Sequence, residues 1–249
     1  MERNCINISI VSYVNWMTKL ELIYASFCGF VDHMERMDEV VLNCFVVTRT
    51  SERFGAYSRK KMDYAFGQLK NGKATEFSVT AALVEKKSET WIKDIAEIAV
   101  SIDPKNNVNI LNVGYNETFL PNLCCQEEIV TRFLKLCIEL VAVTGIVEKL
   151  AYVWGASGVT PMERQAIGFI DINKNYATKL RGYGFGNILT EAHITQLGGI
   201  EAIKKEAPCY MVQELNIGDK QALYLQLQDD IHKPDLENKM KLKQYLTPL

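Results

Sequence analysis

The sequence lacks the charge imbalance and the long apolar runs that mark several large classes of protein. Its 28 lysine and arginine residues nearly balance 30 aspartate and glutamate residues, which gives a formal net charge of -2 at pH 7. A chain so close to neutrality has no strong field to attract nucleic acid or an anionic membrane. No uncharged apolar run reaches the roughly 18 residues of a transmembrane helix, and residues 1–10 lack the apolar core of a signal peptide. We therefore expect a cytoplasmic protein without a nucleic-acid or membrane partner.

Cysteine and histidine occur without the spacing that disulfide or metal chemistry requires. The seven cysteines are odd in number, form no C-x-x-C pair and lie mostly within apolar runs, so we expect reduced thiols in the core. The three histidines, His33, His193 and His232, stand singly, and none forms an H-x-H or H-E-x-x-H arrangement. We expect no metal ion and no cofactor.

Motifs for nucleophilic catalysis and phosphate binding are incomplete. Ser157 lies in the sequence Gly-Ala-Ser-Gly, but a nucleophile elbow needs a second glycine at position 159, where valine stands. The glycines near residue 184 also fail the G-x-G-x-x-G spacing, because Asn187 or Leu189 falls at the sixth position. We assign no catalytic residue. The alternative hypothesis is a small-molecule hydrolase or transferase with a pocket near Ser157, Asp171 and Arg181.

The glycine-rich stretch 181–199, RGYGFGNILTEAHITQLGG, is better explained as a strand that leads into a short helix. Three alternate glycines share one face of such a strand, and the aromatic residues between them share the other. Glycine within a sheet allows a neighbouring backbone or helix to come close. Thr190 is then the expected N-cap of a helix over residues 191–197, which Gly198-Gly199 would end.

Hydrophobic periodicity over the rest of the chain predicts an α+β fold, with a mixed or antiparallel sheet and helices packed on it. No linker divides the chain, so we expect a single domain over residues 1–249, long enough to bury a sizeable core. The predicted strands are 5–14, 40–48, 77–83, 108–115, 150–155, 182–187, 209–215 and 222–228, with an extra strand within 89–103. The predicted helices are 16–34, 58–69, 126–143, a short one opening at 160–163, 191–197 and 235–245.

The order of these elements suggests an internal duplication. Strand, helix, strand, helix and strand follow one another in residues 1–103 and again in residues 104–231. The two segments would form two similar β-α-β-α-β lobes, and the helix at 235–245 would close the chain. This similarity is one of pattern, since the two segments share almost no residue identity.

The segment YATKLRGYGFGNILTEAHITQLGG, followed by a hairpin and a C-terminal helix ending in KLKQYLTPL, resembles the bacterial immunity protein 52 family. Related proteins are the immunity proteins of polymorphic toxins and of type VI secretion. An aromatic-Gly-Asn step before a short helix that ends in Leu-Gly-Gly recurs there, and it is matched by Phe185-Gly186-Asn187 and Leu197-Gly198-Gly199. The resemblance implies a protein that is not an enzyme and that sterically neutralises a cognate toxin, such as a nuclease of restriction-endonuclease fold.

A protein that works by steric inhibition needs a complementary surface with a few anchor residues. Tyrosine and tryptophan make good anchors where they are exposed, and an acidic surface would complement the basic active site of a nuclease. A homodimer that associates through exposed strand edges is a further alternative. The candidate partner-binding residues are Tyr183, Arg181, Tyr176, Tyr57, Trp154, Asp32, Glu35 and Asp38.

Overall fold

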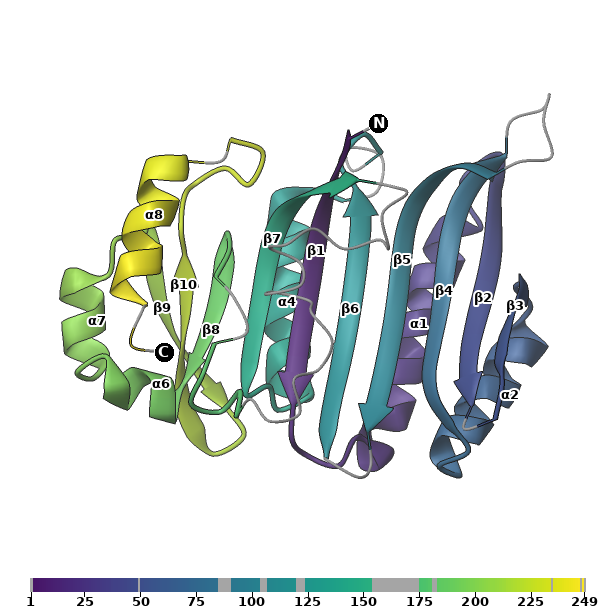
Figure 1. Cartoon of the computed structure of the whole chain (residues 1–249), viewed down its shortest axis with the longest axis horizontal. Helices are drawn as coiled ribbons and strands as arrows, with labels where there is room; N and C mark the ends of the chain where they lie inside the picture. Colours follow the sequence, from purple (N-terminus) through teal and green to yellow (C-terminus); the bar gives the residue numbers. More distant parts are fainter. Residues whose placement is uncertain are drawn as a thin grey trace.

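The fold is built on one antiparallel sheet of ten strands, in the order β3-β2-β4-β5-β6-β1-β7-β8-β10-β9 (Figure 1). We describe it from a computed structural model. The structure describes residues 2–48, 50–84, 91–103, 107–119, 124–153, 175–180, 183–233, 235–246 and 248. Six α-helices accompany the sheet in this part of the chain. The predicted α+β class, with an antiparallel sheet and helices packed on it, is therefore confirmed.

The elements follow the hydrophobic pattern of the sequence closely. The strands are β1 Glu2–Ser12, β2 Val40–Thr48, β3 Glu52–Ala56, β4 Ala74–Val84, β5 Trp91–Asp103, β6 Val108–Asn116, β7 Thr144–Val153, β8 Gly186–Thr190, β9 Met211–Ile217 and β10 Lys220–Gln226. The helices are α1 Leu20–Met34, α2 Arg59–Lys70, α4 Gln126–Glu139, α6 Glu191–Gln196, α7 Ile200–Glu206 and α8 Leu236–Tyr245, and a 3₁₀ turn, η1, spans Trp16–Lys19.

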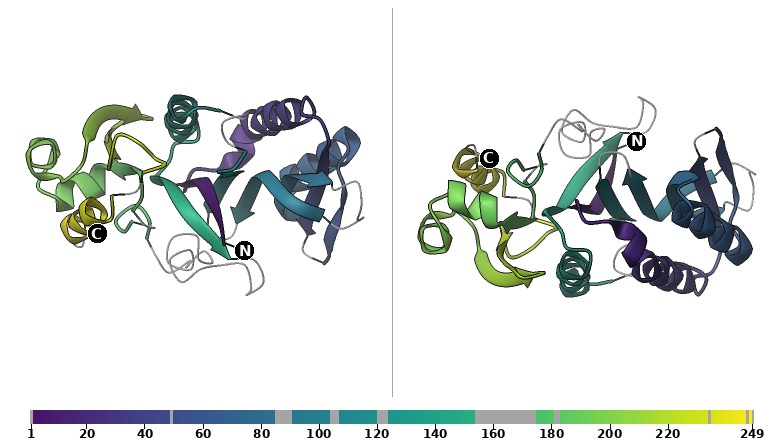
Figure 2. Two further views of the ribbon diagram at one scale, coloured as in Figure 1. Left: turned by 90° about the horizontal axis from the view of Figure 1, so that it is seen from above. Right: turned by 90° about the horizontal axis from the view of Figure 1, so that it is seen from below.

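Helices cover different faces of the sheet at its two ends (Figure 2). Helices α1, α2 and α4 pack on one face, where the large core includes Ile6, Ile8 and Ile10 of β1. Neighbouring residues of β10 contribute to two different cores. Tyr224 belongs to the large core, and Leu223 belongs to a second cluster that includes residues of α6, α7 and α8. β10 is therefore buried on both faces, because the alternation of side chains sends neighbouring residues to opposite layers.

The position of β1 bears on the predicted duplication. β1 lies in the middle of the sheet, paired with β6 on one side and with β7 on the other. Segments 1–103 and 104–231 therefore share one sheet, and the first strand of the first segment is enclosed by strands of the second. The second helix required by the duplication, opening at 160–163, lies outside the described residues. The duplication stays a prediction.

Three local expectations differ from the structure. The helix expected at 126–143 ends at Glu139, and the strand expected at 150–155 begins earlier, at Thr144, four residues after the Leu140 cap. Strand β3 and helix α7 were not predicted, since each is short and carries mostly polar or small residues. Of the predicted strand at 182–187, only the last two residues are part of β8.

Candidate interaction surface

The acidic residues at the C-terminal end of α1 meet the start of α2. Asp32, Glu35 and Asp38 are all exposed. One guanidinium nitrogen of Arg59 donates a hydrogen bond to the Asp32 carboxylate at 2.8 Å, and the other donates to the Cys28 sulfur at 2.7 Å. The side chains of Arg59 and Asp32 are 43% and 52% exposed, so this ion pair contributes little to stability. It does fix the direction of the guanidinium at the surface.

Tyr57 lies beside this acidic end and is half-buried against the core. Burial is the main reason that the pKa of Tyr57 is raised to about 12, and the negative charge of Glu35 contributes to the rise. Three of the predicted partner-binding residues, Tyr57, Asp32 and Glu35, are therefore neighbours in space although they come from two segments of the chain. Nothing in the sequence pattern alone could place them together.

The remaining predicted anchors lie elsewhere. Tyr176 is 3% exposed and packs with Val11 and Ile110, so it fails the exposure that the prediction required. Tyr183 is partly buried against the leucine cluster of β8 and β10. Five strands separate β2 from β8 in the sheet, which corresponds to roughly 29 Å. The Tyr57 group and Tyr183 therefore belong to different parts of the surface.

Four predicted residues lie outside the described part of the chain. They are Trp154 and Arg181 among the partner-binding candidates, and Ser157 and Asp171 of the alternative pocket. Within the described ranges, no group of three or more His, Cys, Asp or Glu side chains is arranged to hold a metal ion. The structure describes all seven cysteines, and none of them forms a disulfide bond. No described helix is both long enough and apolar enough to cross a membrane.

A second surface feature, absent from the sequence-based predictions, lies on the face of the sheet opposite α1 and α2. We call this side of β3, β2 and β4 the open face, because no described helix packs on it. In Figure 1 it faces the viewer, and α1 lies behind the sheet. The alternation of side chains, read from the strand register, places three groups of residues there: Val41, Asn43, Phe45 and Val47 of β2, Glu52, Phe54 and Ala56 of β3, and Glu76, Ser78, Thr80 and Ala82 of β4.

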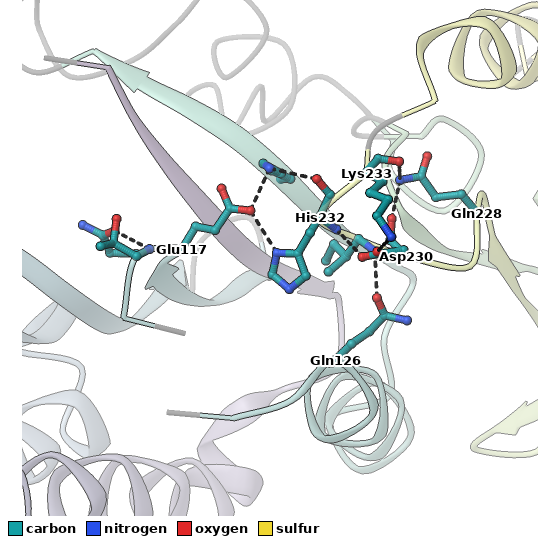
Figure 3. A network of polar contacts seen from close by, with 10 residues as sticks. Glu117, Gln126, Gln228, Asp230, His232 and Lys233 are labelled. Atoms are coloured by element: carbon teal, nitrogen blue, oxygen red, sulfur yellow. Dashed lines mark hydrogen bonds and ion pairs between the residues drawn. The ribbon is translucent and has the colours of Figure 1, made fainter. Parts of the chain in front are cut away.

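Figure 3 shows a polar network that joins the segment before α8 to the central sheet. The Glu117 carboxylate accepts hydrogen bonds from the Lys149 ammonium at 2.7 Å and from the His232 ring at 2.9 Å. Burial raises the pKa of Glu117, but the hydrogen bonds from Lys149 and His232 outweigh it and hold that pKa below its ordinary value. Lys149 also donates to the His232 carbonyl at 3.2 Å. The cation thus bridges a carboxylate and the backbone of the C-terminal segment.

Two glutamines complete the network. Gln126, the first residue of α4, donates to the Asp229 carbonyl and accepts from the Ile231 amide, both at 2.7 Å. Gln228 donates to the carbonyls of Asp230 and Lys233, also at 2.7 Å. These bonds satisfy backbone groups that a loop would otherwise leave unpaired. The network therefore sets the position from which α8 begins.

Helix α8 is also held by a buried ion pair. The Lys239 ammonium of α8 contacts the Glu148 carboxylate of β7, which is 8% exposed. Burial raises the pKa of Glu148, and the charge and hydrogen bond of Lys239 counteract this in part. The second carboxylate oxygen of Glu148 is buried and makes no hydrogen bond. Lys239 is therefore the main compensation for a carboxylate within the protein.

The glycine-rich stretch provides close approach rather than phosphate binding. A Cβ atom at Gly186 would lie 2.8 Å from the Tyr224 ring, and one at Gly184 would lie 2.6 Å from the Val147 carbonyl oxygen. The Asn187 side chain closes the turn, because it accepts from the Gly184 amide at 2.8 Å and donates to the Gly184 carbonyl at 2.9 Å. The predicted role in allowing close packing is confirmed for Gly184 and Gly186, whereas Gly182 lies outside the described residues. Residues 183–185 are not part of a strand.

The helix that follows begins and ends as predicted, and its cap involves a buried histidine. Thr190 is the N-cap of α6, and Gly198 and Gly199 after it have φ angles of 88° and 96°. The Thr190 amide donates to Nδ1 of His193 at 3.1 Å. His193 is fully buried. This ring therefore stays neutral in the folded protein.

Acid is expected to destabilise the protein partly through His193. Burial lowers its pKa from 6.5 to about 4, although backbone groups of Lys179 and Tyr176 act weakly in the opposite direction. Between these values the unfolded chain binds a proton that the folded chain excludes, so stability is present above pH 6.5 and falls as the pH drops toward 4. The loss attributable to this residue is about 3 kcal/mol. Urea unfolding from pH 7 to 4 measures it, and His193→Gln should show a flatter pH dependence. An unchanged pH dependence in the variant would contradict the assignment.

The fold is similar to that of the Pseudomonas aeruginosa T6SS protein PA0821, where T6SS denotes the type VI secretion system. The TM-score is 0.65 and the sequence identity 11%, and the match covers 99% of this chain and 76% of that chain. At this identity the likeness establishes a shared fold. No known protein family and no curated protein sequence matches the chain. The resemblance to the immunity protein 52 family therefore stays a prediction.

Proposed function

We propose that this chain is a type VI secretion immunity protein that binds a cognate toxin and blocks it sterically, without catalytic turnover. The main support is the similarity of fold to a T6SS protein of P. aeruginosa along 99% of the chain. The aromatic-Gly-Asn step and the Leu-Gly-Gly helix end, on which the family resemblance was based, support it independently. In the structure both motifs occupy ordered positions, at the start of β8 and at the end of α6.

The surface chemistry is compatible with this role. Asp32, Glu35 and Asp38 present carboxylates at one end of α1. An acidic surface attracts a basic partner and raises the rate of association, which suits an inhibitor that must reach its toxin before the toxin reaches its substrate. A nuclease carries positive charge around its active site in order to bind phosphate groups. We therefore propose a cytoplasmic nuclease toxin as the partner.

The experiment is co-expression of the chain with the toxin encoded by the adjoining open reading frame. Cells that carry both proteins should survive, cells with the toxin alone should die, and the two purified proteins should elute as an equimolar complex in size-exclusion chromatography. An unrelated toxin with the same reporter strain is the control, and the chain should not protect against it. Failure of the chain to bind the adjoining toxin and to rescue the cells would refute the proposed function.

A further inference from the structure

The open face of β3, β2 and β4 exposes an aromatic side chain on a strand. Phe54 is 68% exposed. It stands on β3, the outermost strand of the sheet, directly opposite Phe45 of β2. Burial of a phenylalanine side chain stabilises by roughly 1.5–3 kcal/mol, so an exposed one is a source of binding energy. An edge strand with an exposed apolar side chain favours association with other chains, and charged side chains beside it restrict which chains can bind.

Two carboxylates flank this apolar area. Glu52 of β3 and Glu76 of β4 are each paired with Val47 of β2, from opposite sides. Two strand spacings separate them, which is about 10 Å. Burial raises the pKa of Glu76, and the negative charge of Glu52 adds to the rise. Among the described residues, neither glutamate forms an ion pair, and every open-face residue of these three strands is uncharged or acidic.

The charge on this surface determines the kind of partner that fits it. Lysine or arginine side chains placed between Glu52 and Glu76 would relieve the repulsion between the two carboxylates. Nucleic acid and anionic lipid carry the wrong sign. A second copy of the chain is also disfavoured, because a two-fold interface sets a patch against itself, and these carboxylates would then face their equivalents.

We propose that the open face of β3, β2 and β4 docks a protein partner through its lysine or arginine side chains, with Phe54 as the apolar anchor and Glu52 and Glu76 as the charged contacts. This inference rests on the proposed function, since the toxin is the partner. On the open face, Phe45 lies between Phe54 of β3 and Ser78 of β4, and is paired with both. Ser78 is 5% exposed and Phe45 is half-buried, so Phe54 is the side chain of this row that a partner residue can pack against.

The experiment measures the affinity of the purified complex with the adjoining-gene toxin. Phe54→Ala should weaken binding about tenfold or more, mainly through faster dissociation, as truncation of an interface anchor does. Glu76→Gln should slow association and reduce its dependence on salt, because it removes charge without changing shape. Neither change should lower the unfolding midpoint, since Phe54 is exposed and replacement of Glu76 removes its repulsion with Glu52.

Matched controls lie on the other side of the sheet. Tyr64 of α2 is 56% exposed, and Glu21 of α1 is exposed as well. Tyr64→Ala and Glu21→Gln should leave affinity within about twofold of the original protein. A wild-type complex that Phe54→Ala does not weaken would overturn this inference while leaving the proposed function intact. Absence of any wild-type complex refutes the proposed function itself. A dimer of the chain alone that Phe54→Ala converts to monomer would show that the occupant is a second copy, and would also overturn the inference.

Discussion

Replacement of Lys239 by methionine is expected to destabilise the protein by about 3–5 kcal/mol at neutral pH, because it leaves a buried carboxylate without its cation. Glu148 is 8% exposed and one of its oxygens already lacks a hydrogen bond. Methionine keeps the length of the lysine stem, so the packing of α8 changes little. Urea unfolding of the two proteins at pH 7 measures the loss.

The pH dependence of this loss tests its cause. The pKa of Glu148 is raised by burial above its ordinary value of 4.5, and the loss of Lys239 raises it further. The pKa of such a carboxyl group is higher in the folded protein than in the unfolded chain. The group therefore lowers the free energy of unfolding as the pH rises above 4.5. The difference between Lys239→Met and the original protein should therefore shrink toward pH 4.5. Equal losses at pH 4.5 and pH 8 would speak against an uncompensated carboxylate.

Two further variants act as controls for Lys239. Glu148→Gln combined with Lys239→Met should recover most of the lost stability, because a neutral amide costs far less to bury than a carboxylate. Lys241 also pairs with a glutamate on α8, but its side chain is 57% exposed and that of Glu237 is 80% exposed. Lys241→Met should have no measurable effect, since exposed pairs contribute little.

Gly184→Ala is the second change with a large expected effect. The added Cβ would lie 2.1 Å from an oxygen of Glu148 and 2.6 Å from the Val147 carbonyl oxygen. The glutamate side chain can rotate, but the carbonyl belongs to β7 and moves only if the strand moves. We expect a loss of about 3 kcal/mol in the free energy of unfolding, the upper range for overpacking in a buried region.

A glycine in open surroundings provides the control. Gly29 lies within α1, and an added Cβ there would meet nothing within 4 Å. Gly29→Ala should stabilise the protein by about 0.5–1 kcal/mol, because alanine favours a helix interior over glycine. If Gly184→Ala were as well tolerated as Gly29→Ala, the turn before β8 would not be packed as described.

The strongly periodic elements were predictable from the sequence. The apolar stripe of the first helix, from Trp16 to Met34, is buried along its whole length. The cap of α6 and the C-terminal helix were also predicted within a residue, because N-cap chemistry and glycine termini act locally. The strand β7 was placed too late, because Leu140 and Val143 continue the apolar spacing of α4 beyond Glu139, where the helix ends.

The surface features were less predictable, because they depend on which strands pair. The acidic end of α1 was identified from sequence, but its neighbour Tyr57 follows a strand that was not predicted. Phe54 was missed for the same reason, as Glu52–Ala56 is short and has only one large apolar residue. The register of β3 with β2 brings Phe54 to Phe45, and register is a property of the folded sheet.

The central position of β1 has a consequence for the order of events during synthesis. β1 leaves the ribosome before both of its partners, β6 and β7, which end at Asn116 and Val153. Its apolar isoleucines therefore have no β6 partner until the residues up to Asn116 are translated, and no β7 partner until those up to Val153 are. Pairing with strands so distant in the sequence slows folding and leaves an unpaired apolar strand open to aggregation. Nascent chains that stall before residue 144 should consequently be clients of chaperones that shield extended apolar segments.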